Sequence, residues 1–142
     1  IMLEKRPVDT DYPEQFLCRS EELLERDKAN VFDVLQWGEP AHAFALRIDS
    51  VAVAYLNRCA HVPTEMDWQP GEFLDSSKQY ILCSIHGAAY EPSSGHCVAG
   101  PCGRGKLTPV TIQEREGRVY WYPSRHTQPP PAPSKSHLPE NE

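Results

Sequence analysis

Two short segments that each contain a cysteine and a histidine constrain the fold more than any other feature of this chain. Residues 59–61 read Cys-Ala-His, and residues 83–86 read Cys-Ser-Ile-His. Thiolates and imidazoles are side chains that bind zinc and iron in proteins. If all four bind one metal centre, the chain has to fold so that two separate loops face each other.

Three interpretations of these segments differ in what they require. If the two cysteines and two histidines were ordinary core residues, all four would have to stand at matched positions by coincidence. A zinc-stabilised interaction module usually pairs cysteines with cysteines and histidines with histidines, so one of each per loop is uncommon there. A [2Fe–2S] cluster with two cysteines on one iron and two histidines on the other accounts for the mixed pairs directly. The pattern therefore favours the iron–sulfur cluster over zinc.

In spacing and order, the two segments resemble the Rieske pattern Cys-x-His…Cys-x-x-His-Gly, and the resemblance covers most of residues 15–122. It implies one Rieske-type [2Fe–2S] cluster per chain, with the cysteines on a buried iron and the histidines on an outer iron near the surface. Carried over position by position, the implied metal ligands are Cys59, His61, Cys83 and His86.

The resemblance also implies three residues that surround the cluster. Gly87 follows the second histidine and permits a tight turn there. Gly100-Pro101 matches the proline-bearing loop that covers the cluster in the family, so Pro101 is expected to lie in that loop. High-potential members of the family resemble this chain at Tyr90, whose hydroxyl would reach the sulfur of a ligand cysteine and raise the reduction potential.

The rest of the sequence indicates an all-β fold. Phe44, Leu46 and Ile48 alternate onto one face of a strand, and Asp49-Ser50 predicts a hairpin turn. Closely spaced short strands are typical of an antiparallel sandwich or barrel, and the family resemblance implies the sandwich. To this β-sandwich the resemblance adds a small cluster-binding subdomain made of two ligand loops and the proline loop. The expected strands cover residues 31–37, 43–48, 51–57, 80–83, 107–113 and 118–122, the last two as a hairpin around Glu116-Gly117.

A chain of 142 residues suits one domain. We place this Rieske domain at residues 1–123, with its cluster-binding part at about residues 57–104. Residues 124–142 are rich in proline, a composition that favours extended or disordered chain.

Charge and cysteine content bear on partners and location. A net charge of −6 argues against nucleic acid and fits docking to a basic protein. We find neither a membrane-spanning apolar segment nor an export signal. Five cysteines, an odd number, argue for reduced thiols and a cytoplasmic protein. A disulfide between Cys97 and Cys102 is therefore not expected, Cys18 is expected in the core, and His42 is expected on the surface.

The subgroups of the family narrow the function. Rieske proteins of the cytochrome bc and b6f type have an extra cysteine after each ligand loop and a membrane anchor, which this sequence lacks. Large oxygenase subunits add a mononuclear-iron domain, for which the chain is too short. A stand-alone Rieske ferredoxin remains: not an enzyme itself, it would carry one electron from a reductase to a terminal oxygenase. A redox-sensing or regulatory subunit is the alternative, with the zinc module less favoured.

Overall fold

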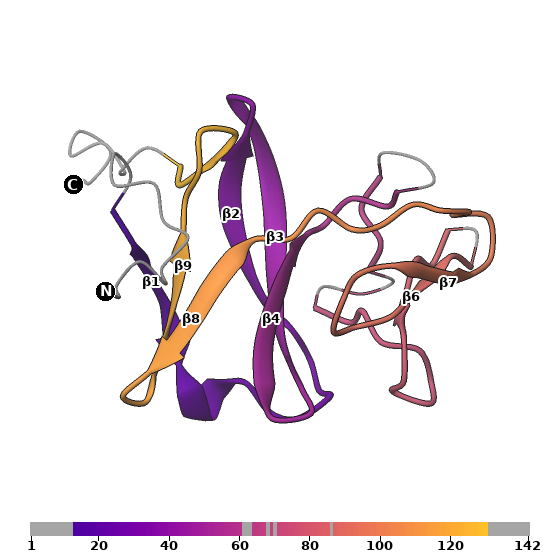
Figure 1. Cartoon of the computed structure of the whole chain (residues 1–142), viewed down its shortest axis with the longest axis horizontal. Helices are drawn as coiled ribbons and strands as arrows, with labels where there is room; N and C mark the ends of the chain where they lie inside the picture. Colours follow the sequence, from indigo (N-terminus) through magenta and orange to yellow (C-terminus); the bar gives the residue numbers. More distant parts are fainter. Residues whose placement is uncertain (1–12, 61–63, 68, 70, 86, 131–142) are drawn as a thin grey trace, which may run out of the picture.

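The structure is a computed structural model that describes residues 13–60, 64–67, 69, 71–85 and 87–130. Three antiparallel sheets make up the fold (Figure 1). The first sheet has the order β1 (Gln15–Arg19), β9 (Arg118–Tyr122), β8 (Thr111–Arg115). The second has the order β10 (Thr127–Gln128), β2 (Asn30–Gln36), β3 (Glu39–Ile48), β4 (Val51–Leu56). The small sheet has the order β5 (Ile81–Leu82), β6 (Ala89–Tyr90), β7 (Cys97–Ala99).

Helix is almost absent from the part of the chain that the structure describes. Residues 20–28 have a sequence that suggests a short helix, but they contain only the 3-10 turn η2 (Ser20–Glu22). None of the described residues forms a helix with the length and apolar content needed to cross a membrane. The all-β prediction is confirmed.

Two-residue turns connect the long strands. In each turn both residues have positive φ, the type I′ geometry whose twist matches that of the flanking strands. Both hairpins expected from the sequence are confirmed, and a third joins β2 to β3. The turns are Trp37-Gly38, Asp49-Ser50 and Glu116-Gly117.

Strand β3 is covered on both of its faces. Phe44, Leu46 and Ile48 alternate onto one face as expected, and all three are buried. The intervening Ala43 and Ala45 are buried as well, on the opposite face. The second sheet is therefore the middle layer of three, with the first sheet on one side and the small sheet on the other.

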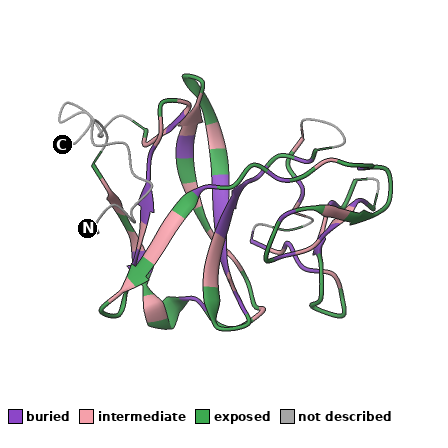
Figure 2. Ribbon diagram, in the orientation of Figure 1, coloured by how far each residue is buried: buried purple, intermediate pink, exposed green. Residues whose placement is uncertain are grey.

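Each face of the second sheet has its own core. The sandwich core, against the first sheet, contains Cys18, Leu23, Val34, Ala43, Ala45, Ala54, Leu56, Val110, Val119 and Trp121. The ligand-side core, against the small sheet, contains larger residues of the second sheet such as Phe44, whose ring stacks on that of Phe73 at a centroid distance of 3.7 Å. In Figure 2 buried stretches of chain, in purple, occur both in the strands of the sandwich and around the small sheet.

The small sheet belongs to residues 57–107, which leave strand β4 and return to it. The chain enters this region directly after Leu56 and comes back alongside β4, where the Leu56 amide donates to the Thr108 carbonyl at 2.9 Å. The Val110 amide then donates to the Ala54 carbonyl at 2.9 Å. We call residues 57–107 the ligand region; it projects from the sandwich at the right of Figure 1.

The second sheet extends beyond the domain boundary expected at residue 123. Strand β10 pairs with the end of β2, Thr127 opposite Gln36 and Gln128 opposite Leu35. The first part of the proline-rich segment is thus sheet, and residues 131–142 lie outside the described residues.

Candidate metal centre

Each predicted ligand loop is closed at its base by a backbone hydrogen bond from its cysteine. The Cys59 amide donates to the Thr64 carbonyl at 2.9 Å, and the Cys83 amide donates to the Ala88 carbonyl at 2.8 Å. In both loops the acceptor lies five positions after the cysteine, at 64 after 59 and at 88 after 83. The two loops are therefore built on the same frame, although their Cys–His spacings differ.

A buried asparagine ties the first loop to the rest of the molecule. Asn57 accepts a hydrogen bond from the Met66 amide at 2.8 Å and donates to Asp67 at 3.0 Å through its side chain. Its own amide donates to the His42 carbonyl on β3 at 2.8 Å. The Ser84 amide donates to the Met66 carbonyl at 3.0 Å, which joins the second loop to the first. The sequence analysis missed Asn57; an asparagine directly after a strand and before a ligand loop was the signal.

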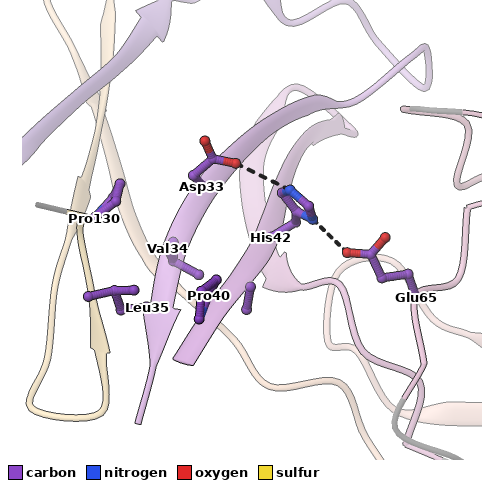
Figure 3. Close-up of a pocket in the computed structure, with 8 residues that line it drawn as sticks. Asp33, Val34, Leu35, Pro40, His42, Glu65 and Pro130 are labelled. Carbon is purple, nitrogen blue, oxygen red and sulfur yellow. Dashed lines mark hydrogen bonds and ion pairs between the residues drawn. The ribbon is translucent and has the colours of Figure 1, made fainter. Parts of the chain in front are cut away.

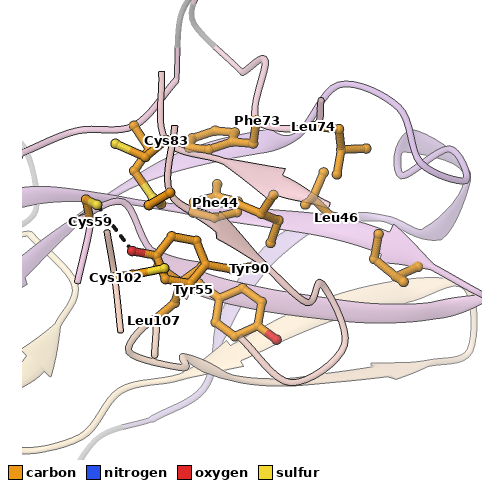
Figure 4. Packing of buried hydrophobic residues seen from close by; sticks show 14 residues of the cluster. Phe44, Leu46, Tyr55, Cys59, Phe73, Leu74, Cys83, Tyr90, Cys102 and Leu107 are labelled. Carbon is orange, nitrogen blue, oxygen red and sulfur yellow. Dashed lines mark hydrogen bonds between the residues drawn. The ribbon is translucent and has the colours of Figure 1, made fainter. Parts of the chain in front are cut away.

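The two loop cysteines are buried in the ligand-side core (Figure 4). Cys59 is 3% exposed and Cys83 is 0% exposed, and neither is in a disulfide. Buried apolar surroundings oppose a thiolate unless a metal or cation compensates its charge. Two such thiols at the start of matched loops suit the inner half of a [2Fe–2S] cluster. His61 and His86 lie outside the described residues.

Tyr90 provides a hydrogen bond at Cys59. Its hydroxyl oxygen lies 3.2 Å from Cys59 Sγ, the contact that the resemblance implied, and accepts the Ala60 amide at 3.0 Å (Figure 4). Because the amide occupies an acceptor site of the oxygen, the hydroxyl proton can point to sulfur. Burial and, to a smaller extent, the hydrogen bond to Cys59 raise the pKa of Tyr90, so the hydroxyl keeps its proton.

The proline loop packs on the second ligand loop. Gly87 has φ +79°, as its place in a tight turn requires. Gly100 has φ +85°, and a Cβ there would lie 2.7 Å from the Gly87 carbonyl oxygen and 2.9 Å from Ala88 Cα. Only glycine permits so close an approach. Pro101, the next residue, is exposed.

A disulfide joins the two ends of the proline loop, so the expectation of reduced thiols there was wrong. Cys97 and Cys102 are bonded with their Cα atoms 5.8 Å apart, within the usual range for disulfides. The backbone brings them together because the Cys97 amide donates to the Gly105 carbonyl and the Gly105 amide to the Cys102 carbonyl. Disulfides are rare in reducing compartments, so this bond weakens the argument for a cytoplasmic protein.

The remaining cysteine lies in the sandwich core, as expected. Cys18 is 2% exposed, and burial raises its thiol pKa to about 11. It therefore stays protonated at neutral pH and packs as a small apolar residue.

A pocket of about 420 Å³ lies over β2 and β3 and includes none of the five cysteines (Figure 3). At its edge the exposed His42 ring bridges two carboxylates, with Nδ1 at 2.6 Å from Glu65 and Nε2 at 3.3 Å from Asp33. The hydrogen bond to Glu65 raises the pKa of His42. Among the described residues, no group of three or more His, Cys, Asp and Glu side chains could hold a metal. We regard the His42–Glu65 pair as a link between β3 and the segment after the first ligand loop.

Comparisons with known proteins agree with this geometry. A family model described as Rieske [2Fe-2S] domain matches residues 14–122. A search of curated proteins found no match.

Three solved structures illustrate the likeness in fold. A chain of the reduced complex between oxygenase and ferredoxin in carbazole 1,9a-dioxygenase is 22% identical, with a TM-score of 0.62 over 83% of this chain and 30% of that chain. The terminal oxygenase of carbazole 1,9a-dioxygenase from Novosphingobium sp. KA1 is 24% identical, with a TM-score of 0.56 over 78% of this chain and 29% of that one. A chain in the complex of reduced oxygenase and oxidized ferredoxin is 19% identical, with a TM-score of 0.58 over 77% of this chain and 92% of that one. The present chain thus spans about 30% of the length of the first two.

Proposed function

Since the chain belongs to the Rieske [2Fe–2S] family and the domain implies a cluster of the Rieske type, we propose that it is a one-electron carrier between a reductase and a terminal oxygenase. The observation that supports this most strongly is the pair of buried thiols, Cys59 and Cys83, that begin two matched loops. A cluster held there accepts and releases single electrons.

The chain's own residues have separate roles in this proposal. Cys59 and Cys83 would hold one iron of the cluster, and His61 and His86 would hold the other. The Tyr90 hydroxyl would donate a hydrogen bond to the Cys59 sulfur, which stabilises negative charge on that ligand. Burial of both thiols in the ligand-side core excludes water from the inner side of the site.

Two observations favour a carrier for an oxygenase over an enzyme. The pocket of about 420 Å³ lies over β2 and β3, and neither loop cysteine lines it. In addition, one matched chain, of which the present chain covers 92%, belongs to a complex of oxygenase and ferredoxin. The proposed partners are therefore a reductase and a terminal oxygenase.

Metal analysis with paired variants tests the proposal. Purified protein should contain about two iron atoms and about two acid-labile sulfides per chain, and it should cycle between dithionite and cytochrome c with one electron per cluster. Cys59→Ser and Cys83→Ser should lose the cluster, whereas Cys18→Ala, which removes a thiol from the other core, should keep it. Stoichiometric zinc without labile sulfide would overturn the proposal.

The Tyr90 hydroxyl offers a finer test of the site. A hydrogen bond that favours the reduced cluster by about 0.5–1.5 kcal/mol corresponds to roughly 20–65 mV for one electron. Tyr90→Phe should therefore lower the reduction potential by about that amount while iron content stays unchanged. Tyr55→Phe is a suitable control, because the Tyr55 hydroxyl donates instead to the Pro92 carbonyl at 2.7 Å. Equal potentials for the two variants would exclude the assigned role of Tyr90.

A further inference from the structure

Three loops meet at the outer end of the ligand region. A Cβ built on Gly105 would lie 2.8 Å from the Ala60 Cβ, so the segment after the proline loop touches the first ligand loop. Gly100 makes the equally close approach to the second ligand loop at Gly87. The described parts of the two ligand loops and the proline loop therefore form one continuous surface.

Each of the three loops has exposed apolar residues. Ile85 lies in the second ligand loop and is 52% exposed, and Val98 lies at the start of the proline loop and is 50% exposed. Ala60 in the first ligand loop and Pro101 in the proline loop are exposed as well. Figure 2 shows the outer strand and loops of the small sheet largely as exposed chain. Exposed apolar side chains on loops that touch one another suit a docking surface.

Cationic side chains border these apolar residues. Arg58 immediately precedes the first loop, and Arg104 and Lys106 flank Gly105; all three are exposed. Residues 83–88 and 97–106 contain no aspartate or glutamate. No carboxylate among the described residues pairs with any of the three cations, whereas sandwich arginines do form pairs, as in Arg47–Glu114 at 2.7 Å.

Three carboxylates near these loops in sequence are already engaged. Glu91, three residues after Ala88, accepts a hydrogen bond from the Ser93 amide at 2.8 Å. Glu65 contacts His42 at 2.6 Å. Asp67 accepts hydrogen bonds from the Asn57 side chain at 3.0 Å and the Gly71 amide at 3.2 Å. Glu65 is thus held at β3, and Asp67 is engaged within the ligand region, so neither carboxylate pairs with the three cations. The outer surface is therefore locally positive, in a chain whose net charge is −6.

We propose, building on the carrier function, that this surface docks onto a redox protein whose binding face is rich in carboxylates. Interfaces of this kind combine an apolar centre with a polar rim, and complementary charge on the rim accelerates encounter. Salt screens charges beyond about 10 Å at ordinary ionic strength, so the rim at the contact governs the approach more than the distant acidic groups of the sandwich. The partner's charge is thus opposite to the one expected from composition.

Small redox ions test the local field. Reduced protein should transfer one electron to the trianion ferricyanide faster at about 0.1 M salt, where charges beyond about 10 Å are screened, than at about 1 M salt, and the trication tris(phenanthroline)cobalt(III) should show the reverse. In the variant Arg104→Glu/Lys106→Glu the ferricyanide rate at about 0.1 M salt should fall about tenfold, at the low end of steering effects. The matched control is Arg118→Glu/Arg125→Glu, which makes the same charge change at exposed sandwich positions and should alter the rate less than twofold.

Two proteins of opposite charge test the partner class, with binding as a second readout. Acidic flavodoxin in its fully reduced form should give one electron to the oxidised protein quickly, and it should bind measurably in calorimetry at about 0.1 M salt. Basic cytochrome c in its oxidised form should take up one electron from the reduced protein slowly. The Arg104→Glu/Lys106→Glu variant should reverse this preference while retaining its iron and sulfide. A full cluster with unchanged preference in this variant would overturn the docking surface alone, whereas absence of the cluster in the wild type would overturn the carrier function itself.

Discussion

The sandwich and the ligand region keep their shapes by different means. Apart from the two-residue β10, the sandwich has strands of five to ten residues in long ladders, as in the seven paired positions of β2 and β3. The ligand region has strands of two, two and three residues. Its order depends instead on the bases of the two loops, on Asn57, on a disulfide and on shared burial against β3.

This difference indicates where the molecule is easiest to open. A sheet with such short strands is marginal by itself, and regions with few ladder bonds open with lower free energy than core strands. The ligand region therefore depends on its cross-links and on its cluster, while the sandwich should persist without them.

Removal of the cluster should produce the largest contrast between the two regions. Metal binding is coupled to folding of the residues that hold the metal, so amide exchange at Cys59 and Cys83 should accelerate on the order of a hundredfold in cluster-free protein. Amides in the middle of β2 and β3 should change little. Hydrogen-exchange mass spectrometry checks this, and equal acceleration in both regions would contradict the division.

The second-largest contrast between the two regions should come from truncation of one large aromatic side chain in each core. Phe44→Ala and Trp121→Ala remove buried rings from the ligand-side core and the sandwich core, at 0% and 4% exposure. Each should lower the free energy of unfolding by about 3–5 kcal/mol. Only Phe44→Ala should also accelerate cluster loss to a chelator, because Phe44 packs in the core that contains the loop cysteines. Similar chelation rates for both variants would show that the cores are not independent.

Opening of the disulfide should have a smaller effect, confined to the ligand region. For a sequence separation of 5, the chain-entropy relation gives about 2 kcal/mol. Cys97→Ser/Cys102→Ser should therefore lose its cluster faster on heating, and a phosphine reductant should reproduce this in the wild type. Cys18→Ala serves as the control in the other core. If the wild-type protein keeps the same rate of cluster loss after the reductant has been shown to open its disulfide, the disulfide does not stabilise the ligand region.

The contact between His42 and Glu65 should make the smallest contribution to the free energy of unfolding, and only over part of the pH range. The folded-state pKa of His42 is raised, first by the hydrogen bond to Glu65, with further contributions from Asp33 and Asp67. Its stabilisation is therefore complete below the unfolded pKa of about 6.5 and is lost as pH rises through the higher folded pKa. Because the side chain is 47% exposed, we expect about 0.2–1 kcal/mol.

Denaturant titrations of wild type and His42→Gln at several pH values measure this contribution. The difference in free energy of unfolding should be largest at about pH 5–6 and should vanish in the alkaline range. A difference that is independent of pH would mean that His42 acts by packing alone.

Much of the fold follows from local sequence, and the cluster type follows from motif spacing. Asp49-Ser50 and Glu116-Gly117 predicted hairpins because the geometry of a two-residue turn depends on those residues themselves. The pattern of Phe44, Leu46 and Ile48 identified one buried face, since side chains alternate along any strand. It did not reveal that Ala43 and Ala45 are buried on the other face, because whether a second layer covers a strand depends on distant segments.

The sequence by itself determined the family of the metal centre and the order of its two loops, because both are encoded in contiguous residues. The roles of the ligand histidines remain a prediction from that motif. Only the tertiary structure decided that Cys97 and Cys102 are bonded and that Asn57 ties the first loop to β3. It also decided that the exposed cations Arg58, Arg104 and Lys106 lie on loops at the outer end of the ligand region, in a chain that is acidic as a whole. Each of these depends on which groups the folded backbone brings within a few ångströms, and composition and spacing contain no such distances.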